Sequence, residues 1–371
     1  MNQDCLQLTQ QEEIECINLI PRIKLMADHG DQYAMYSMGS LMKKGKLIGV
    51  NKQQAANYFK KSANLGNVDS AYEYAIMCDI GDGIQLNKQE GARYFKQAAD
   101  NGNAESMYCY GCKLHNGDGV EINMIEAAHY LKNGANMGNV KSMFAYGMML
   151  FRGEGIQMDK KKAAEYLKMA SDKGNDNAMY CYASMLLNGN GIERNDREGL
   201  FYLKKSADLG NEESSYEYGM LCDAGQLVEM NKGEAARYYK KAANTGHVDA
   251  MYQYGLKVHN GEGVAVNMVE AAHYFKMASI YGHPGAMYAY GMMLYRGEGQ
   301  QVDKVCAAQY IKCAADNGNA GAMFCYSVML NNGDGVEQNS QEAIRYLVMS
   351  ANYGHPQAIA YLQRNNRSIS I

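Results

Sequence analysis

The sequence has no tryptophan, and its 371 residues include only three prolines, Pro21, Pro284 and Pro356. Because proline disrupts helix interiors, this scarcity allows a chain that is helical almost throughout. No run approaches the eighteen or so apolar residues that a membrane-spanning helix needs. The sequence therefore predicts no membrane insertion.

An excess of positive charge is also missing. The chain carries 36 basic and 40 acidic residues, for a formal net charge of -4. Such a surface creates no global field that attracts nucleic acid, so we expect no nucleic-acid partner. The N-terminal stretch MNQDCLQLTQQEEIE lacks the basic and apolar regions of a secretory signal, and the ten cysteines follow no paired spacing. Together these features favour the cytoplasm, where thiols stay reduced.

The chain is dominated by an internal repeat. A glycine followed by Asn, His or Asp recurs every 36 residues from Gly30 to Gly354, which defines nine complete repeats without an insertion. Counting each of these glycines as position 0, position 15 is always Gly, position 21 is always Asn or Asp, and position 28 is always Tyr. A strict period of this length is typical of a solenoid.

Each of these columns has a structural interpretation. The Asn or Asp at position 21 predicts a helix N-cap, and the Glu three residues later, as in NKQE at 87–90, predicts a capping box. The glycine at position 15 predicts the left-handed C-cap of a preceding helix. Each repeat is therefore expected to hold helix A, a loop, helix B and a turn.

Hairpins of this kind cannot bury their apolar faces alone and must stack on their neighbours. We therefore predict an all-α fold, a right-handed superhelical α-solenoid of nine 36-residue helix-turn-helix repeats. Residues 1–29 are expected to form an N-terminal capping segment, a degenerate half-repeat. Residues 30–353 are expected to hold the nine repeats, and residues 354–371 a C-terminal capping helix and tail.

The pattern G-N-x-x-A-M-Y-x-Y-G-x-M-L-x-x-G-x-G-V-x-x-N-x-x-E-A-A-x-Y-x-K-x-A-A resembles the Sel1-like repeat, a relative of the tetratricopeptide repeat, over residues 30 to about 363. The resemblance implies an adaptor that holds other proteins on a superhelical surface and carries no catalytic residues. Some relatives act in endoplasmic-reticulum quality control, and others in bacterial or protist signalling and host interaction.

Three local motifs invite a chemical interpretation, and each is better explained by structure. The G-x-G loops lack the strand or the G-K-[ST] of a nucleotide site. Their single acidic residues fall short of the six to eight oxygens that Ca²⁺ takes. The Cys109 to Cys112 pair lies within helix A, away from a helix N-terminus where a thiolate is stabilised. We expect no cofactor, no metal and no catalytic site.

The variable positions of helix A are more informative. Positions 3, 7, 10 and 14 share one face at about 100° per residue, with position 13 beside them, and this face is expected to line the concave surface. The predicted partner-binding residues are Asp69, Glu73, Asp79, Glu105, His115 and Arg152 in repeats two to four, and Glu213, Glu217, Asp223, His259 and Arg296 in repeats six to eight.

This series recurs because repeats two to five match repeats six to nine at roughly half of all positions. Two explanations stay open: block duplication with solvated faces, or two similar binding patches. The predicted function is a non-enzymatic scaffold or adaptor that binds protein or peptide partners on the concave helix A face. The alternatives are a regulatory or host-interaction factor that senses a small ligand, an adaptor of the endoplasmic-reticulum quality-control type, and an enzyme with an unrecognised site.

Overall fold

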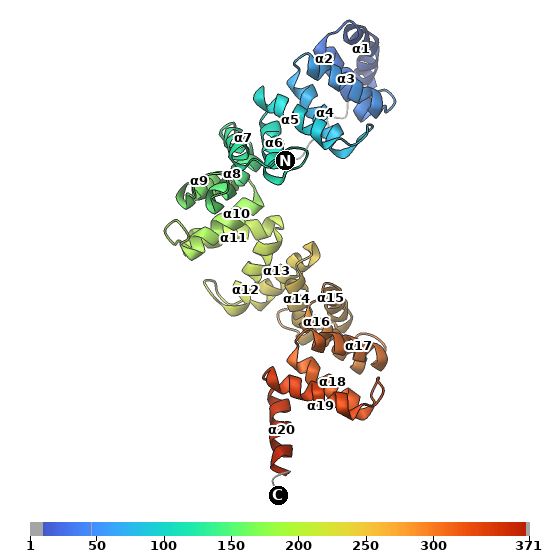
Figure 1. The fold of residues 1–371 in the computed structure, drawn as a ribbon, viewed down its shortest axis with the longest axis vertical. Helices are drawn as coiled ribbons and strands as arrows, with labels where there is room; N and C mark the ends of the chain where they lie inside the picture. Colours follow the sequence, from blue (N-terminus) through green and yellow to red (C-terminus); the bar gives the residue numbers. More distant parts are fainter. Residues whose placement is uncertain (1–9, 46, 369–371) are drawn as a thin grey trace. The chain divides into compact units, whose positions relative to one another are not determined.

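The computed structural model describes residues 10–45 and 47–368, and within them the chain forms twenty helices and no strand. The prediction of an all-α helical repeat fold is confirmed. Contacts divide the chain into two compact units, Met1–Arg194 and Asn195–Ile371, here called the N-terminal and C-terminal halves. Within each half, consecutive helices lie side by side (Figure 1).

Helix A of each repeat begins just after the position 0 glycine. These helices are α2 (Gln32–Lys44), α4 (Val68–Ile80), α6 (Ala104–Asn116), α8 (Val140–Arg152), α10 (Asp176–Asn188), α12 (Glu212–Ala224), α14 (Val248–Asn260), α16 (Pro284–Arg296), α18 (Ala320–Asn332) and α20 (Pro356–Ser368).

Helix B follows the loop. These helices are α3 (Lys52–Asn64), α5 (Lys88–Asp100), α7 (Met124–Asn136), α9 (Lys160–Asp172), α11 (Asp196–Leu209), α13 (Lys232–Thr245), α15 (Met268–Ile280), α17 (Lys304–Asp316) and α19 (Ser340–Asn352), with α1 (Gln10–Asp28) preceding the first repeat. Within a half, helix A packs on helix B of its own repeat, and helix B packs on the next helix A.

The caps form where the sequence places them, with one correction. Asn87 accepts a hydrogen bond from the Glu90 backbone N–H at 3.0 Å, as an N-cap should. A capping box also predicts a hydrogen bond from the Asn87 backbone N–H to the Glu90 side chain. That prediction is wrong, because the Asn87 N–H donates to the Cys78 carbonyl of helix A at 2.8 Å. The Glu90 side chain is thereby left to pair with Lys60 of the previous repeat, at 2.8 Å.

The G-x-G loop uses its two glycines for different purposes. Gly153 is the left-handed C-cap of α8, with φ 73°, and its N–H donates to the Met149 carbonyl at 2.8 Å. Gly155 also has positive φ, and a Cβ there would lie 2.3 Å from the Met124 carbonyl oxygen of the preceding repeat. The second glycine therefore allows one repeat's loop to touch the backbone of its neighbour.

Tyrosines hold each hairpin together and join it to the hairpin before it. Tyr110 of helix A meets Tyr130 of helix B edge to face, with ring centroids 4.9 Å apart. The Tyr130 hydroxyl then donates to Asp100 at the end of the previous helix B. The same pairing occurs for Tyr238, whose hydroxyl lies 2.7 Å from Asp208. Position 28 tyrosines such as these bind neighbouring repeats through both apolar and polar contacts, whereas Tyr310 has Ile280 in place of the acceptor.

Candidate partner-binding face

The predicted site residues lie on helix A, and the structure divides them by exposure. Asp69, Glu105, Arg152, Glu213 and Arg296 are exposed, whereas the other six are half-buried. The half-buried members are Glu73, Asp79, His115, Glu217, Asp223 and His259. This division separates residues that are open to a partner from residues engaged within the chain.

Asp79 belongs to a cluster around a buried lysine. Lys113 is only 5% exposed, and its ammonium contacts the carboxylate of Asp79 and lies 3.0 Å from Asp118 in its own loop. Lys88 approaches the same two carboxylates, at 3.7 Å from Asp79 and 3.2 Å from Asp118. The cluster connects repeats two and three, which gives Asp79 a structural role in addition to the predicted one.

The C-terminal half repeats the arrangement around Lys257, which is also 5% exposed. Its ammonium lies 2.7 Å from Asp223 and 2.6 Å from Glu262, and Lys232 lies 2.7 Å from Asp223. Burial works to raise the pKa of Asp223, but hydrogen bonds from Lys232 and Lys257 outweigh it and hold that pKa below its ordinary value. The carboxylate therefore stays charged beside its lysines at neutral pH.

The loop glutamate of G-E-G connects His115 and Arg152. Glu154 lies 3.0 Å from the His115 Nε2 atom and 3.6 Å from the Arg152 guanidinium. Hydrogen bonds with Asn116 and then Glu154 raise the pKa of His115 above its ordinary value. The G-E-G loop is therefore a bridge between repeats three and four.

The equivalent contacts recur in the C-terminal half. Glu298 lies 3.3 Å from His259 and 3.7 Å from Arg296. Both arginines remain exposed, at 55% of the side chain. These distances allow only a loose, solvent-screened pair, so each guanidinium stays accessible to solvent.

The two lysine clusters escaped the sequence analysis, although a signal was present. Position 11 of helix A is Met or Leu in most repeats and Lys in repeats three and seven, at Lys113 and Lys257. A charged residue in an apolar column is rarely buried without partners. Comparing columns for such exceptions would have pointed to Asp79 and Asp223 as those partners.

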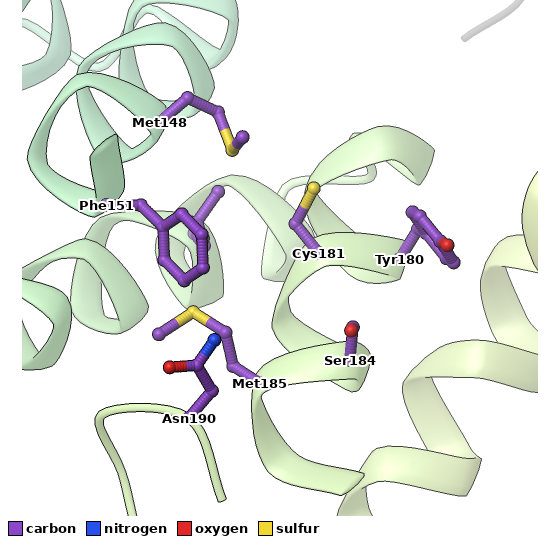
Figure 2. A pocket seen from close by; sticks show the side chains of 8 residues that line it. Met148, Phe151, Tyr180, Cys181, Ser184, Met185 and Asn190 are labelled. Atoms are coloured by element: carbon purple, nitrogen blue, oxygen red, sulfur yellow. The ribbon is translucent and has the colours of Figure 1, made fainter. Parts of the chain in front are cut away.

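An apolar pocket, also absent from the predictions, lies between α8 and α10 (Figure 2). Met148 and Phe151 line one wall, and Tyr180, Cys181, Ser184 and Met185 line the other, with Leu167 and Asn190 completing the pocket. Its volume is about 120 Å³. Cys181 and Ser184 occupy the variable positions 7 and 10, so the pocket opens on the predicted face.

The cysteines on this face behave as small apolar side chains. Burial raises the pKa of Cys181 to about 11, although the positive charge of Arg152 acts to lower it. Burial likewise raises the pKa of Cys109 to about 11, and the pKa of Cys112 is raised for the same reason. Thiols with such values are protonated at neutral pH, which makes them poor nucleophiles.

Over the residues that the structure describes, no His, Cys, Asp and Glu side chains group in a way that could hold a metal ion. Nor does the described part of the chain contain a helix with the length and apolarity that crossing a membrane requires. The loop acids Asp118, Glu154 and Asp334 instead contact lysine, histidine or tyrosine side chains of the same chain.

Comparison with known proteins gives a consistent result. The family model described as Sel1 repeat matches residues 32–67, 68–103, 104–139, 140–175, 176–211, 213–247, 248–280, 284–319 and 320–355. Among the curated proteins, none matches the chain.

Several solved structures resemble the fold, among them two bacterial proteins. The protein c5321, a protective antigen present in uropathogenic Escherichia coli strains and displaying an SLR fold, is 21% identical, with a TM-score of 0.61 over 97% of this chain and 88% of that one. A Sel1 repeat protein from Oxalobacter formigenes is also 21% identical, with a TM-score of 0.54 over 96% of this chain and 95% of that one.

Proposed function

Since the chain belongs to the Sel1 repeat family, whose solenoid fold is generally used for protein–protein interaction, we propose that it is a non-enzymatic scaffold that binds protein or peptide partners on its helix A face. A cytosolic location and the lack of a nucleic-acid partner belong to the same proposal and rest on the sequence. The observation that carries it is the mixed surface of this face, which holds exposed charges of both signs and an apolar pocket.

In the N-terminal half, this face changes sign from one helix to the next. Asp69 on α4 and Glu105 on α6 are exposed acids, whereas Lys141 and Arg152 on α8 are exposed bases. Helices in contact have axes roughly 8–10 Å apart, so an extended peptide crosses one helix about every three residues. A partner segment with the opposite charge order would match this surface.

The half-buried residues of the predicted site contact other residues of the same chain, so they are less suited to a binding test. Asp79 and Asp223 contact buried lysines, and Glu73 lies 2.7 Å from Lys43. Charge reversal at these residues would change folding as well as binding. The exposed residues Asp69, Glu105 and Glu213 therefore give the cleaner test.

The test is affinity capture of partners by the full chain, with cross-linking to map the footprint. Charge reversal at Asp69 together with Glu105, or at Arg152, should reduce capture and shift the cross-links. The control is Glu165→Lys, which changes an exposed carboxylate on the B helix α9. Equal capture by every variant, or cross-links confined to the B helices, would reject the helix A face.

A second candidate, binding of a small ligand, is favoured by one observation. A hollow of about 360 Å³ lies among α13, α14 and α15, within the size range of small-molecule pockets. Its polar lining is partly engaged already, since the Tyr274 hydroxyl donates to Asn244 at 2.9 Å and the His273 ring packs against Tyr274. A ligand-dependent rise in melting temperature that Met277→Trp abolishes would support this candidate.

A further inference from the structure

The pocket between α8 and α10 has the chemistry of a receptor for one apolar side chain. Phe151, Met148 and Met185 supply aromatic and thioether surface, and the protonated Cys181 thiol adds to it. In Figure 2, Met148 and Phe151 of α8 lie across the opening from Cys181 of α10, and Met185 lies beside Phe151. The lining residues include no carboxylate and no ammonium group.

The size of the pocket identifies its occupant more closely. Small-molecule sites usually enclose about 300–1,000 Å³, whereas this pocket encloses about 120 Å³. An apolar cavity of roughly 150 Å³ holds a single benzene ring. The space therefore suits one aliphatic or aromatic side chain and is too small for a cofactor.

The rim of the pocket is positively charged. Arg152 is exposed, and its positive charge reaches the Cys181 thiol in the pocket wall. Lys160 lies 5.5 Å above the Phe151 ring and donates to Asn190 at 2.8 Å. The loop acid Glu154 has one oxygen 3.0 Å from His115 and the other 3.6 Å from the Arg152 guanidinium. Because the Arg152 contact is loose and exposed, and Lys160 adds a second positive charge, a ligand carboxylate near the apolar group would meet a favourable field.

We propose that this pocket binds one apolar side chain of a partner peptide, such as Leu, Met or Phe, while Arg152 pairs with an acidic residue a short distance along the same peptide. This inference rests on the proposed scaffold function and specifies the kind of partner. Exposed Glu105 and Asp69 on the preceding A helices would then face basic residues farther along the peptide.

The duplicated repeats of the C-terminal half provide an internal comparison. The residues equivalent to Phe151, Ser184 and Asn190 are Tyr295, Val328 and Asp334. The Tyr295 hydroxyl is bonded to Asp334, and Asp334 lies 2.8 Å from Lys304. A bulkier wall and a fixed carboxylate at this place oppose the same acidic ligand, so each chain should bind one peptide of this class.

The experiment uses the full-length protein and short fluorescent peptides with a Ser and Asn background. One set carries Leu with Asp one to three residues away, and matched sets replace Leu by Ser or Asp by Lys. Binding is followed by fluorescence anisotropy. The variants are Ser184→Phe, which fills the pocket, Ser184→Val, which copies the residue at Val328, and Arg152→Glu. The control for charge reversal is Lys132→Glu, at an exposed base on the B helix α7.

We expect the Leu and Asp peptides to bind one per chain, and the Leu to Ser change to weaken binding about tenfold or more. Ser184→Phe should cause a similar loss, and Ser184→Val a smaller one. Arg152→Glu should weaken the Asp peptide about tenfold and reverse the preference between Asp and Lys. Lys132→Glu should leave binding within about twofold.

The inference is overturned if no Leu and Asp peptide binds, if Ser replaces Leu without loss, or if Lys132→Glu weakens binding as much as Arg152→Glu. Thermal melts of each variant show whether it is folded, and Ser184→Val supplies a conservative substitution. If partners still cross-link to the A helices while Ser184→Phe and Arg152→Glu have no effect, the scaffold function stands and only this pocket assignment fails. Cross-links absent from the A helices would instead reject the proposed function.

Discussion

The Lys113 cluster permits a thermodynamic test of why a lysine lies in an apolar column. Lys113 is 5% exposed, whereas the side chains of its partners Asp79 and Asp118 are 23% and 42% exposed. Replacing a buried ion pair by apolar residues is often neutral or stabilising, but removing one partner leaves an uncompensated charge and costs about 3–5 kcal/mol. The two kinds of change therefore separate clearly.

We predict that Lys113→Met changes the free energy of unfolding by no more than about 1 kcal/mol. Methionine occupies the same position in the neighbouring repeats, at Met77 and Met149, and both are buried. The two carboxylates left behind are exposed enough to be solvated and keep Lys88, at 3.7 Å and 3.2 Å. The apolar replacement thus removes a buried charge and leaves no other buried charge without a partner.

Removal of the acids should have the opposite result. Asp79→Asn together with Asp118→Asn leaves the Lys113 ammonium buried without an anion, and we expect a loss of about 3–5 kcal/mol. Adding Lys113→Met to that pair should recover at least about half of the loss. The assay is urea unfolding followed by circular dichroism, with the differences taken from the unfolding midpoints.

Two outcomes would refute this reasoning. A Lys113→Met variant as unstable as the double asparagine variant would mean that the ion cluster itself supplies the stability. Failure of Lys113→Met to rescue the double asparagine variant would mean that Asp79 and Asp118 stabilise the chain through other contacts. Arg93→Met, at an exposed residue on α5, controls for introducing methionine nearby.

Other substitutions test the caps and the tyrosine column. Tyr238→Phe should cost about 1–2 kcal/mol in urea unfolding, because its hydroxyl donates to a carboxylate at 2.7 Å, whereas Tyr310→Phe should cost almost nothing, because Ile280 stands where the acceptor would be. Leu227, with φ 61°, occupies the second glycine position of its loop, where the left-handed backbone strains a residue with a Cβ. Leu227→Gly should therefore raise the free energy of unfolding by about 0.5–1 kcal/mol. A free energy of unfolding below that of the unchanged protein would contradict this strain. Burial lowers the pKa of His283, an N-cap that accepts from Ala286 at 3.0 Å, below its ordinary 6.5. The unfolded chain then binds more protons, so the stability due to His283 is present above about pH 6.5 and lost on acidification; melts at several pH values should show His283→Asn removing that loss.

Much of the fold could be predicted because each element depends on short-range sequence signals. The cap at Asn87 needs only a side-chain oxygen close to the start of helix B, and the C-cap at Gly153 needs only a residue that tolerates positive φ. The period then repeats these local rules. Contacts across repeats were harder to predict, because Gly155 is required by a carbonyl 31 positions earlier.

The sequence predicts which side of helix A the candidate residues occupy, but not which of them are exposed. Helical periodicity places Asp79 and Arg152 on one side of their helices, but it does not distinguish an exposed arginine from an aspartate held by a buried lysine. That difference depends on Lys113, which comes from the next repeat. The pocket likewise depends on how Met148 and Phe151 pack against Cys181, which no single repeat specifies.

Residues at equivalent positions of the two duplicated blocks fall into two classes, those that are retained and those that differ. Those retained in both halves, such as the lysine cluster of Asp79 and Asp223 and the histidine bridge of His115 and His259, have partners within the chain. Their recurrence follows from the packing of the repeats and requires no ligand.

Some of the residues that differ between the halves line the pocket. Ser184 corresponds to Val328, and Asn190 corresponds to Asp334. These changes alter the size and charge of the pocket opening, whereas the position 28 tyrosines are the same in both halves. Because Arg152 recurs as Arg296, the two halves share a basic residue at this place and differ in the side chains beside it. We therefore expect any difference in ligand preference between the halves to come from the pocket wall.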